Sequence, residues 1–331
     1  TYSVVEGQPE GWLDGQDRVG TVAGTRVGTL SNDRLDQIAL RWGDEGRDYD
    51  FGELQAVAIR GRVQLATREG DCFTGAENHD PVAGALVELL NERGDVLETT
   101  VTDANGEYAF VGLRPGTYSV REITPVGLLD GGARGGTIGD RAVGSVEDGV
   151  VTNLVVFSGE VVDDVDFCEH LPASLSGHVY HDRDDDGRRE AGEEGIPGVL
   201  VRLLDQDGGE IARRRSDADG RYEFDALPAG TYSVVESHPE TWLDGKDSVG
   251  LVGDVRVGRA GADRLDAVQL LWGDVGREYN FGEFLGATLR GRVQLADREG
   301  NCFGARENHE PLANVLVTLF DAAGQRVAQT R

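Results

Sequence analysis

The chain has 331 residues, enough for about two to three domains. It is strongly acidic, with a formal net charge of −28 and a pI near 4.5. This charge argues against nucleic acid and anionic membrane as partners, because both are bound through a positively charged face, and it favours cations. The chain also contains 48 glycines and frequent D-G, N-G and P-G pairs. This composition predicts an all-β fold with many tight turns.

The sequence is built from blocks that recur with a domain-sized period. The block TYSV begins at Thr1, Thr117 and Thr231, 116 and then 114 residues apart. A segment with G-x-V, an acidic stretch and then V-x-V/L-x-L-L starts at Gly61, Gly177 and Gly291, with the same two spacings. Because two independent landmarks agree on the period, we interpret the chain as a tandem array of modules.

A longer period of 230 residues indicates that two types of module alternate. The segment GRVQLATREGDCF returns 230 positions later as GRVQLADREGNCF, whereas the module between them carries an acidic loop at the corresponding place. Trp12 and Trp42 recur with this longer period at Trp242 and Trp272. We interpret the tryptophans as packing residues of one module type rather than as a platform for stacking sugars.

We expect four segments in chain order. Residues 1–56 would form the C-terminal part of a truncated module, 57–172 a complete module with a cysteine pair, 173–285 a complete module with the acidic loop, and 286–331 the N-terminal part of another truncated module. Short runs of alternating apolar and polar residues are typical of half-buried strands. In the first complete module we place strands at residues 58–65, 85–90, 96–102, 107–110, 116–122, 151–157 and 165–169. Seven short strands in about 110 residues predict a β-sandwich.

The acidic loop lies between two segments that read as strands. Its residues match D-x-[DN]-x-[DN]-G-x5-E, the spacing that folds several carboxylates and one backbone carbonyl around Ca²⁺. We expect the calcium ligands to come from Asp182, Asp184, Asp186, the Arg188 carbonyl, Glu190 and Glu193. The flanks are not helical, so the loop would join two strands, unlike the loop of a helix-loop-helix EF-hand. The alternative is an acidic turn in an already acidic chain.

The equivalent loops of the other module type lack the triple-aspartate core and are two residues longer. In the first of them, Glu69, Asp71, Glu77 and Asp80 would form at most a weaker site, because fewer well-placed carboxylates lower the affinity for calcium.

Further acidic residues lie on turns rich in glycine. The segments TDANGEYAF and SDADGRYEF read first as β-hairpin turns, with a metal-ligand role as the alternative. The loops LDGQDRVG and LDGKDSVG bring Asp14 near Asp17 and Asp244 near Asp247. A second calcium site at these loops stays open, because they offer oxygen ligands.

Cys72 and Cys168 are expected to form a disulfide. Cys72 follows the first strand of the first complete module and Cys168 lies in its last strand, and the second complete module lacks both. The two cysteines are therefore gained and lost together, and Cys302 is left over. Such a bridge persists in an extracellular compartment. The alternative is two buried free thiols, since cysteine is a common small core residue.

The sequence offers no assembled catalytic site. The six histidines are scattered, and none fits a zinc-protease or catalytic-triad pattern. G-x-S-x-G, Walker and dinucleotide-binding patterns are also missing from the sequence. We therefore expect a protein that is not an enzyme.

At the level of longer segments, the chain resembles a known family. YHDRDDDGRREAGEEGIPGVLVRLLD, SDADGRYEFDALPAGTYSVVE and the closing REYNFGE resemble the B domains of serine-aspartate-repeat (SdrD-type) surface proteins, relatives of the collagen-adhesin B-type (Cna B-type) modules. The resemblance covers essentially the whole chain. It implies tandem transthyretin-like Greek-key β-sandwich modules, a calcium-stabilised stalk and an extracellular, surface-attached setting.

Two functions follow as hypotheses. The first is a non-catalytic, calcium-stabilised stalk or spacer of a large bacterial cell-surface or secreted adhesin-like protein. The alternative is a ligand-binding module that recognises a glycan or an extracellular protein through the long loops after each TYSV strand. Calcium is the expected cofactor, and neither nucleic acid nor membrane contact is expected within this chain.

Overall fold

The computed structural model describes residues 1–70, 72–73, 79–296 and 310–331. These residues contain β-strands and turns and no helix, which confirms the all-β prediction. It follows that no described segment is a helix long and apolar enough to cross a membrane. The chain divides into two compact units, Thr1–Phe284 and Leu285–Arg331.

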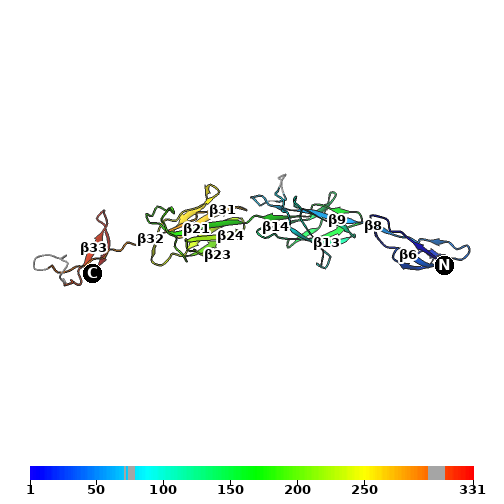
Figure 1. Cartoon of the computed structure of the whole chain (residues 1–331), viewed down its shortest axis with the longest axis horizontal. Helices are drawn as coiled ribbons and strands as arrows, with labels where there is room; N and C mark the ends of the chain where they lie inside the picture. The colour runs from blue at the N-terminus through cyan, green and yellow to red at the C-terminus, as the bar shows by residue number, and fades with distance from the viewer. Residues whose placement is uncertain (71, 74–78, 297–309) are drawn as a thin grey trace. The chain divides into compact units, whose positions relative to one another are not determined.

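Residues 57–170 form a sandwich of two sheets (Figure 1). One sheet has the order β11-β10-β13-β18-β17, and the other has the order β12-β9-β20-β14 with β19 added beside β9. The strands are β9 (Val57–Leu65), β10 (Leu86–Leu90), β11 (Val96–Val101), β12 (Glu107–Leu113), β13 (Gly116–Ile123), β14 (Leu129–Arg134), β15 (Gly136–Ile138), β16 (Arg141–Val143), β17 (Ser145–Glu147), β18 (Val150–Val156), β19 (Val161–Val162) and β20 (Asp166–His170).

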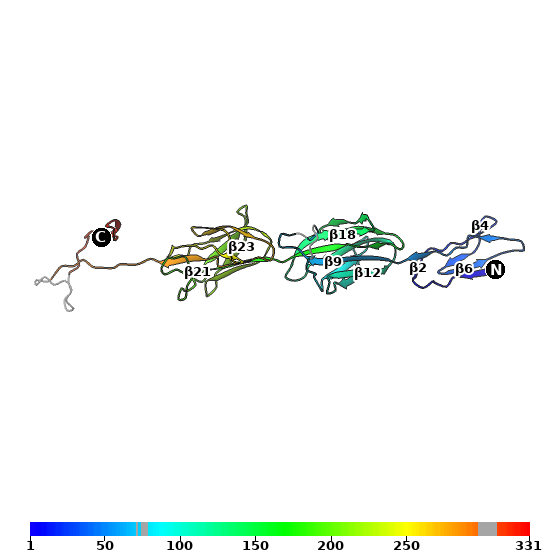
Figure 2. The same cartoon turned by 90° about the horizontal axis from the view of Figure 1, so that it is seen from above.

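Residues 173–285 repeat this arrangement (Figure 2). One sheet has the order β23-β22-β25-β30-β29, and the other has the order β26-β32-β21-β31-β27-β28 with β24 beside β21. The strands are β21 (Ala173–His181), β22 (Leu200–Leu204), β23 (Glu210–Arg215), β24 (Arg221–Leu227), β25 (Gly230–Glu236), β26 (Trp242–Asp244), β27 (Leu251–Val252), β28 (Val255–Arg256), β29 (Arg259–Gly261), β30 (Arg264–Leu270), β31 (Val275–Arg277) and β32 (Phe281–Leu285).

The two ends of the chain contain smaller sheets. The N-terminal segment has the sheets β1-β6-β5, β2-β8 and β4-β3-β7, and the C-terminal unit has the pair β33-β34. Their strands are β1 (Tyr2–Val5), β2 (Trp12–Asp14), β3 (Thr21–Val22), β4 (Thr25–Arg26), β5 (Thr29–Ser31), β6 (Arg34–Ile38), β7 (Gly46–Arg47), β8 (Glu53–Gln55), β33 (Val317–Phe320) and β34 (Arg326–Thr330).

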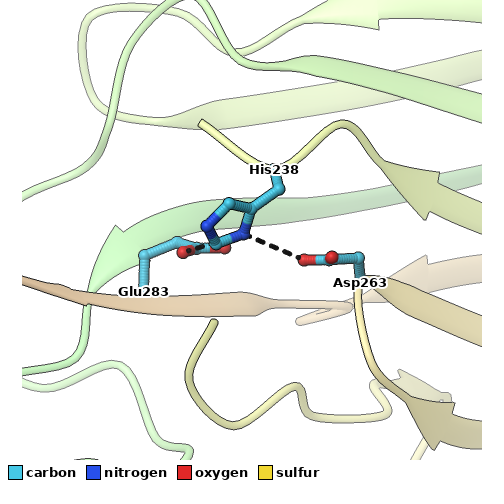
Figure 3. Close-up of side chains that lie close together, drawn as sticks. All are labelled: His238, Asp263 and Glu283. Atoms are coloured by element: carbon cyan, nitrogen blue, oxygen red, sulfur yellow. Dashed lines mark hydrogen bonds and ion pairs between the residues drawn. The ribbon is translucent and has the colours of Figure 1, made fainter. Parts of the chain in front are cut away.

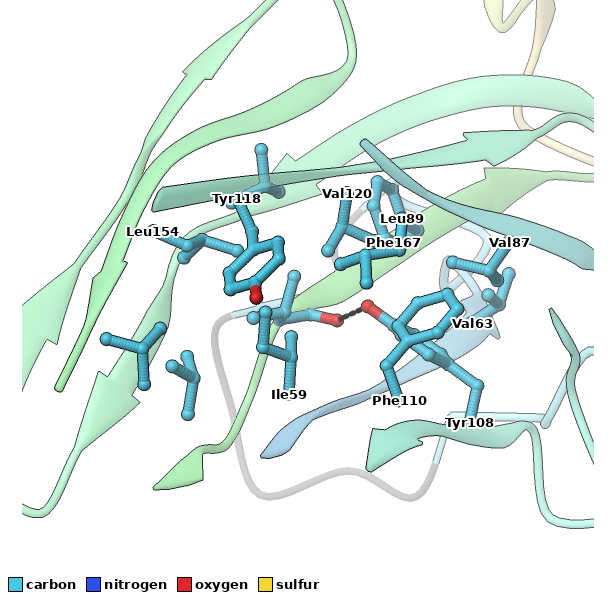
Figure 4. Close-up of a cluster of buried hydrophobic side chains, with 14 of the residues drawn as sticks. Ile59, Val63, Val87, Leu89, Tyr108, Phe110, Tyr118, Val120, Leu154 and Phe167 are labelled. Atoms are coloured by element: carbon cyan, nitrogen blue, oxygen red, sulfur yellow. Dashed lines mark hydrogen bonds between the residues drawn. The ribbon is translucent and has the colours of Figure 1, made fainter. Parts of the chain in front are cut away.

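Each complete sandwich has its own hydrophobic core, built from the alternate residues of its strands. In the first core, Tyr108 and Phe110 meet edge to face, with ring centroids 5.9 Å apart (Figure 4). The Tyr108 hydroxyl donates a hydrogen bond of 2.6 Å to the Val165 carbonyl, so the one polar atom of this ring is satisfied in the core. Tyr222 and Phe224 form the equivalent pair in the second core, at 5.9 Å.

The recurring G-x-V glycine is explained by the pairing of the first strand with the last. In both sandwiches these strands run parallel, as in the pairing of β9 with β20 and of β21 with β32. A Cβ atom at Gly61 would overlap the Val165 carbonyl oxygen, and one at Gly177 would overlap that of Tyr279. Only glycine lets the two backbones approach so closely.

The structure also corrects parts of the strand prediction. All seven strands expected in the first sandwich overlap observed ones, but β14, β15, β16, β17 and β19 were not expected. Four of these are only two or three residues long, and β14 is rich in glycine, so all five carry little periodic signal. In the N-terminal segment the sequence also predicts a strand over residues 35–42, but the observed strand β6 ends at Ile38. The division of the chain at residues 56, 172 and 285 stays a prediction.

The expected β-hairpins at TDANGEYAF and SDADGRYEF are wrong in one respect. Asp103 Oδ1 accepts hydrogen bonds from the backbone N–H groups of Asn105 and Glu107, at 2.8 and 2.9 Å, so the tight turn is present. However, β11 and β12, which flank it, pair in different sheets. The turn therefore connects the two layers of the sandwich, and an aspartate that is occupied in this way is a turn residue.

Candidate functional site

The acidic loop joins β21 to β22 and begins beside the last strand of the same sandwich. The Asp182 N–H donates a hydrogen bond of 2.8 Å to the Glu283 carbonyl on β32. Asp182 is fully buried and Glu193 is only 9% exposed, although both are carboxylates. Burial of two like charges is costly unless hydrogen bonds or a cation compensate.

Three of the expected ligands come together in this loop. Carboxylate oxygens of Asp182, Asp184 and Glu193 lie within 4.8 Å of one another. The loop backbone orients them: Asp182 accepts the N–H groups of Asp186 and Gly187, at 3.2 and 2.8 Å. Glu193 is held in the same way, because its Oε1 accepts the Arg183 N–H at 2.8 Å. The carboxylates of Asp182 and Glu193 are therefore held in place by the backbone of their own loop, with that of Asp184 beside them.

The other three expected ligands lie outside this group. Asp186 Oδ1 accepts the Arg188 N–H at 2.7 Å, and Glu190 contributes its backbone N–H to Glu193 Oε2 at 2.9 Å. No described contact links the Arg188 carbonyl or the Glu190 carboxylate to the three clustered side chains. Their roles as ligands stay predictions.

The donor set of the loop fits Ca²⁺. Calcium takes six to eight oxygen ligands at about 2.3–2.6 Å, and carboxylates and backbone carbonyls are its usual donors. The sharp turn that brings them together needs left-handed backbone at Gly187, with φ of 81°, and at Asp185, with φ of 54°. Lys246 Nζ lies 3.6 Å from the Asp185 carboxylate, so the single lysine of the chain partly balances the charge of this loop.

A second acidic group occupies the same sandwich and was not foreseen as a unit. Its members are Glu236 at the end of β25, Glu283 on β32 and Asp247, and the charge of Asp247 helps to raise the pKa of both glutamates. Burial is the largest cause in each case, and it raises the pKa of Glu236 to about 9, of Glu283 to about 8 and of Asp247 to about 7. The LDGKDSVG motif indicates Asp247 as a candidate ligand, whereas the two glutamates lie on strands and belong to no acidic motif.

The N-terminal segment contains a related group. Ligand oxygens of Asp14, Asp17 and Asp33 lie within 4.8 Å of one another. The sequence predicted that Asp14 lies near Asp17, and the structure places Asp33, which precedes β6, beside them. The 230-residue period is the signal that could have found it, because it relates Asp33 to Asp263 and Glu53 to Glu283.

The cysteine pair lies beside the parallel pairing of β9 with β20 in the first sandwich. Cys72 and Cys168 are joined by a disulfide with their Cα atoms 5.8 Å apart, and both side chains are buried. The bridge links the loop after β9 to β20. The weaker calcium site was expected in the same loop, and two of its residues, Asp71 and Glu77, lie outside the described residues.

The tryptophans differ in their surroundings. The Trp272 ring stacks on the His170 imidazole with the centroids 3.7 Å apart, and Trp242 packs against the second core and the edge of His181. Trp42 is fully exposed. The segments proposed as ligand-binding loops, which follow β13 and β25, contain the short strands β14–β17 and β26–β29, so they are only partly loops.

A family model for the SdrD B-like domain matches residues 66–166 and 173–253, more than half of the chain. The chain belongs to the SdrD B-like domain family. Serine-aspartate repeat-containing protein C of Staphylococcus aureus strain N315 is 36% identical over 189 residues, which is 54% of this chain and 19% of that protein. The same protein of strain Newman is also 36% identical over 189 residues, covering 54% of this chain and 20% of its own length. This SdrD B-like chain thus spans about a fifth of the length of these relatives.

Solved structures similar to this SdrD B-like chain are remote in sequence. The Bacillus anthracis TIE protein is 14% identical with a TM-score of 0.30, over 86% of this chain and 42% of that one. The shaft pilin spaA of Lactobacillus rhamnosus GG is 12% identical with a TM-score of 0.29, over 72% of this chain and all of that one. The sheet orders described above establish the sandwich fold without them.

Proposed function

We propose that this chain is a calcium-stabilised structural region, a stalk or spacer, of a bacterial cell-surface adhesin-like protein. The observation that carries the proposal is the group of Asp182, Asp184 and Glu193 in the loop beside β32. A cation bound there would neutralise two buried carboxylates in a loop that hydrogen-bonds the last strand. It would thus fasten the connection between β21 and β22 to the body of the sandwich.

The short connections between successive sheets of the chain support the role of a stalk or spacer. Only Leu171 and Pro172 separate β20 from β21, and only Ala56 separates β8 from β9. Linkers of one or two residues leave successive modules little independent freedom, in contrast to long flexible linkers. Repetition of one fold with short links is what a spacer requires.

The disulfide supports an extracellular location. Disulfides persist in oxidising compartments and are rare in the reducing cytosol. The membership in the SdrD B-like family agrees with a location at the cell surface. A non-catalytic role is supported by the same membership and by the lack of an assembled catalytic constellation in the sequence.

The experiment is thermal unfolding of the whole chain with calcium and with a chelator. Wild type is compared with D184A, which removes the oxygen ligand of one clustered side chain at an exposed position, and with D207A, the same change in a turn away from the group. We expect calcium to raise the unfolding midpoint of wild type and D207A, and to raise that of D184A much less. Equal calcium responses in all three proteins would refute the proposal.

A further inference from the structure

His238 lies among carboxylates in the second complete sandwich, away from the acidic loop motif. Its Nδ1 atom is 3.4 Å from Asp263 Oδ1 and 3.5 Å from Glu283 Oε2, and all three side chains point toward one another (Figure 3). His238 follows β25, Asp263 precedes β30, and Glu283 lies on β32. Three elements that are distant in sequence therefore bring one nitrogen and two oxygen donors together.

The other ring nitrogen fixes the tautomer of His238. Nε2 lies 3.0 Å from the Trp242 carbonyl oxygen, which can only accept a hydrogen bond. Nε2 must therefore carry the proton, and in the neutral ring the lone pair of Nδ1 faces the two carboxylates. This is the arrangement of a histidine that ligates a metal ion, since such histidines usually donate their second N–H to a carbonyl or a carboxylate.

The buried glutamates lack the partners that a carboxylate needs. Glu283 is fully buried and Glu236 is 3% exposed. Within the described part of the chain, none of their four carboxylate oxygens takes part in a hydrogen bond. Buried polar atoms are nearly always satisfied, and Glu283 has only its 3.5 Å contact to the His238 ring, so the two buried carboxylates indicate a missing positive ligand.

The N-terminal segment provides an internal comparison, because Gln8 stands where the 230-residue period places His238. The Gln8 amide donates to the Trp12 carbonyl at 3.3 Å and to Glu53 at 2.6 Å. It thus contacts the counterparts of Trp242 and Glu283, but through N–H groups, which cannot ligate a metal. The group of three potential ligands in that segment contains oxygens alone.

We propose that His238, Asp263 and Glu283 form a binding site for a zinc-class divalent ion, distinct from the calcium loop. A nitrogen donor suits zinc and related transition metals, whereas calcium prefers oxygen alone. The spacing fits as well: zinc bonds of about 2.0–2.2 Å in a tetrahedron place neighbouring ligand atoms about 3.3–3.5 Å apart. A water molecule would complete the four ligands, and two carboxylates would neutralise the charge of the ion.

The test is a titration of the whole chain with Zn²⁺, and separately with Co²⁺ as a spectroscopic probe, both in excess calcium. H238Q is the decisive variant, because it recreates the residue found at position 8 of the same chain. D184N is the control, since it alters the calcium loop and leaves this group intact.

We expect wild type and D184N to bind one more equivalent of zinc than H238Q, and to give the intense visible absorption of four-coordinate Co²⁺. In H238Q the affinity of this site for zinc should fall at least about tenfold, because one of three protein ligands is lost. Zinc binding that is the same in wild type and H238Q would overturn the proposal. So would a Co²⁺ spectrum typical of six oxygen ligands, or the finding that His238 stays protonated in excess zinc, because a protonated ring would satisfy the carboxylates without a metal.

Discussion

Removal of the Cys72–Cys168 bridge should selectively destabilise the first complete sandwich. The change is the double substitution C72A/C168A, which avoids placing hydroxyl groups at two buried positions. The bridge closes a segment with a sequence separation of 96 residues. In the chain-entropy account, a loop of this length contributes about 4.7 kcal/mol by restricting the unfolded chain, which is an upper estimate because strain reduces it.

Hydrogen exchange measured by mass spectrometry of peptides is the suitable assay. The four tryptophans lie outside residues 57–170, and Trp272, which stacks on His170, belongs to the neighbouring sandwich, so fluorescence does not separate the two sandwiches as peptide exchange does. If the core amides of residues 57–170 exchange through global opening, the loss of about 4.7 kcal/mol would speed their exchange roughly three orders of magnitude. Residues 173–285 contain no cysteine and serve as the internal control.

Exchange should accelerate in residues 57–170 by at least about tenfold, allowing for strain in the native bridge. It should remain unchanged in residues 173–285. A smaller acceleration of exchange in the first sandwich, or an equal acceleration in both sandwiches, would refute the claim that the disulfide stabilises the first sandwich selectively.

Three further predictions concern the second complete sandwich and the lysine. In the presence of chelator, the stability of the second complete sandwich should fall as the pH rises from about 5 to about 9. The pKa values of Glu236 and Glu283 are raised to about 9 and about 8, so across this range the folded state holds protons that the unfolded state has released. Thermal melts that show no decline in stability across this range would contradict this prediction. The substitution G177A should lower the free energy of unfolding in urea by about 1–3 kcal/mol, because the new Cβ collides with the Tyr279 carbonyl. G7A is the control and should have little effect, because the space around Gly7 is open. Equal losses in the two variants would contradict the explanation by close backbone approach. Lys246 is exposed and pairs with Asp185, so we expect it to form no isopeptide bond. The intact mass should then equal the sequence mass less the two hydrogens of the disulfide. A further loss of one ammonia, localised to Lys246, would contradict this prediction.

The sequence predicted the features that repeat locally and missed those that depend on packing between distant elements. Strands such as β9 and β13 alternate apolar and polar residues over seven or more positions, and this periodicity is readable from the sequence. β14, with the sequence LDGGAR, and the two-residue β19 have no such pattern. They become strands because neighbouring strands offer them hydrogen bonds.

The candidate sites follow the same rule. Asp182, Asp184 and Glu193 belong to one continuous motif, and the spacing alone brought them together. His238, Asp263 and Glu283 come from three elements, and their proximity depends on how β25, β30 and β32 meet at one end of the sandwich. The hairpin expected at Asp103 failed for a related reason: the turn chemistry is local, but which strand each flank pairs with is decided by the whole sandwich.

Direct calcium binding, followed by isothermal titration calorimetry, tests the central claim most directly. Wild type is compared with the double variant D182N/E193Q, which removes the two buried carboxylates of the loop. We predict that wild type binds one more calcium ion than the variant, with a Kd of about 10⁻⁴ to 10⁻³ M, as in extracellular calcium modules. Identical calcium isotherms for the two proteins, with the variant folded, would contradict the account.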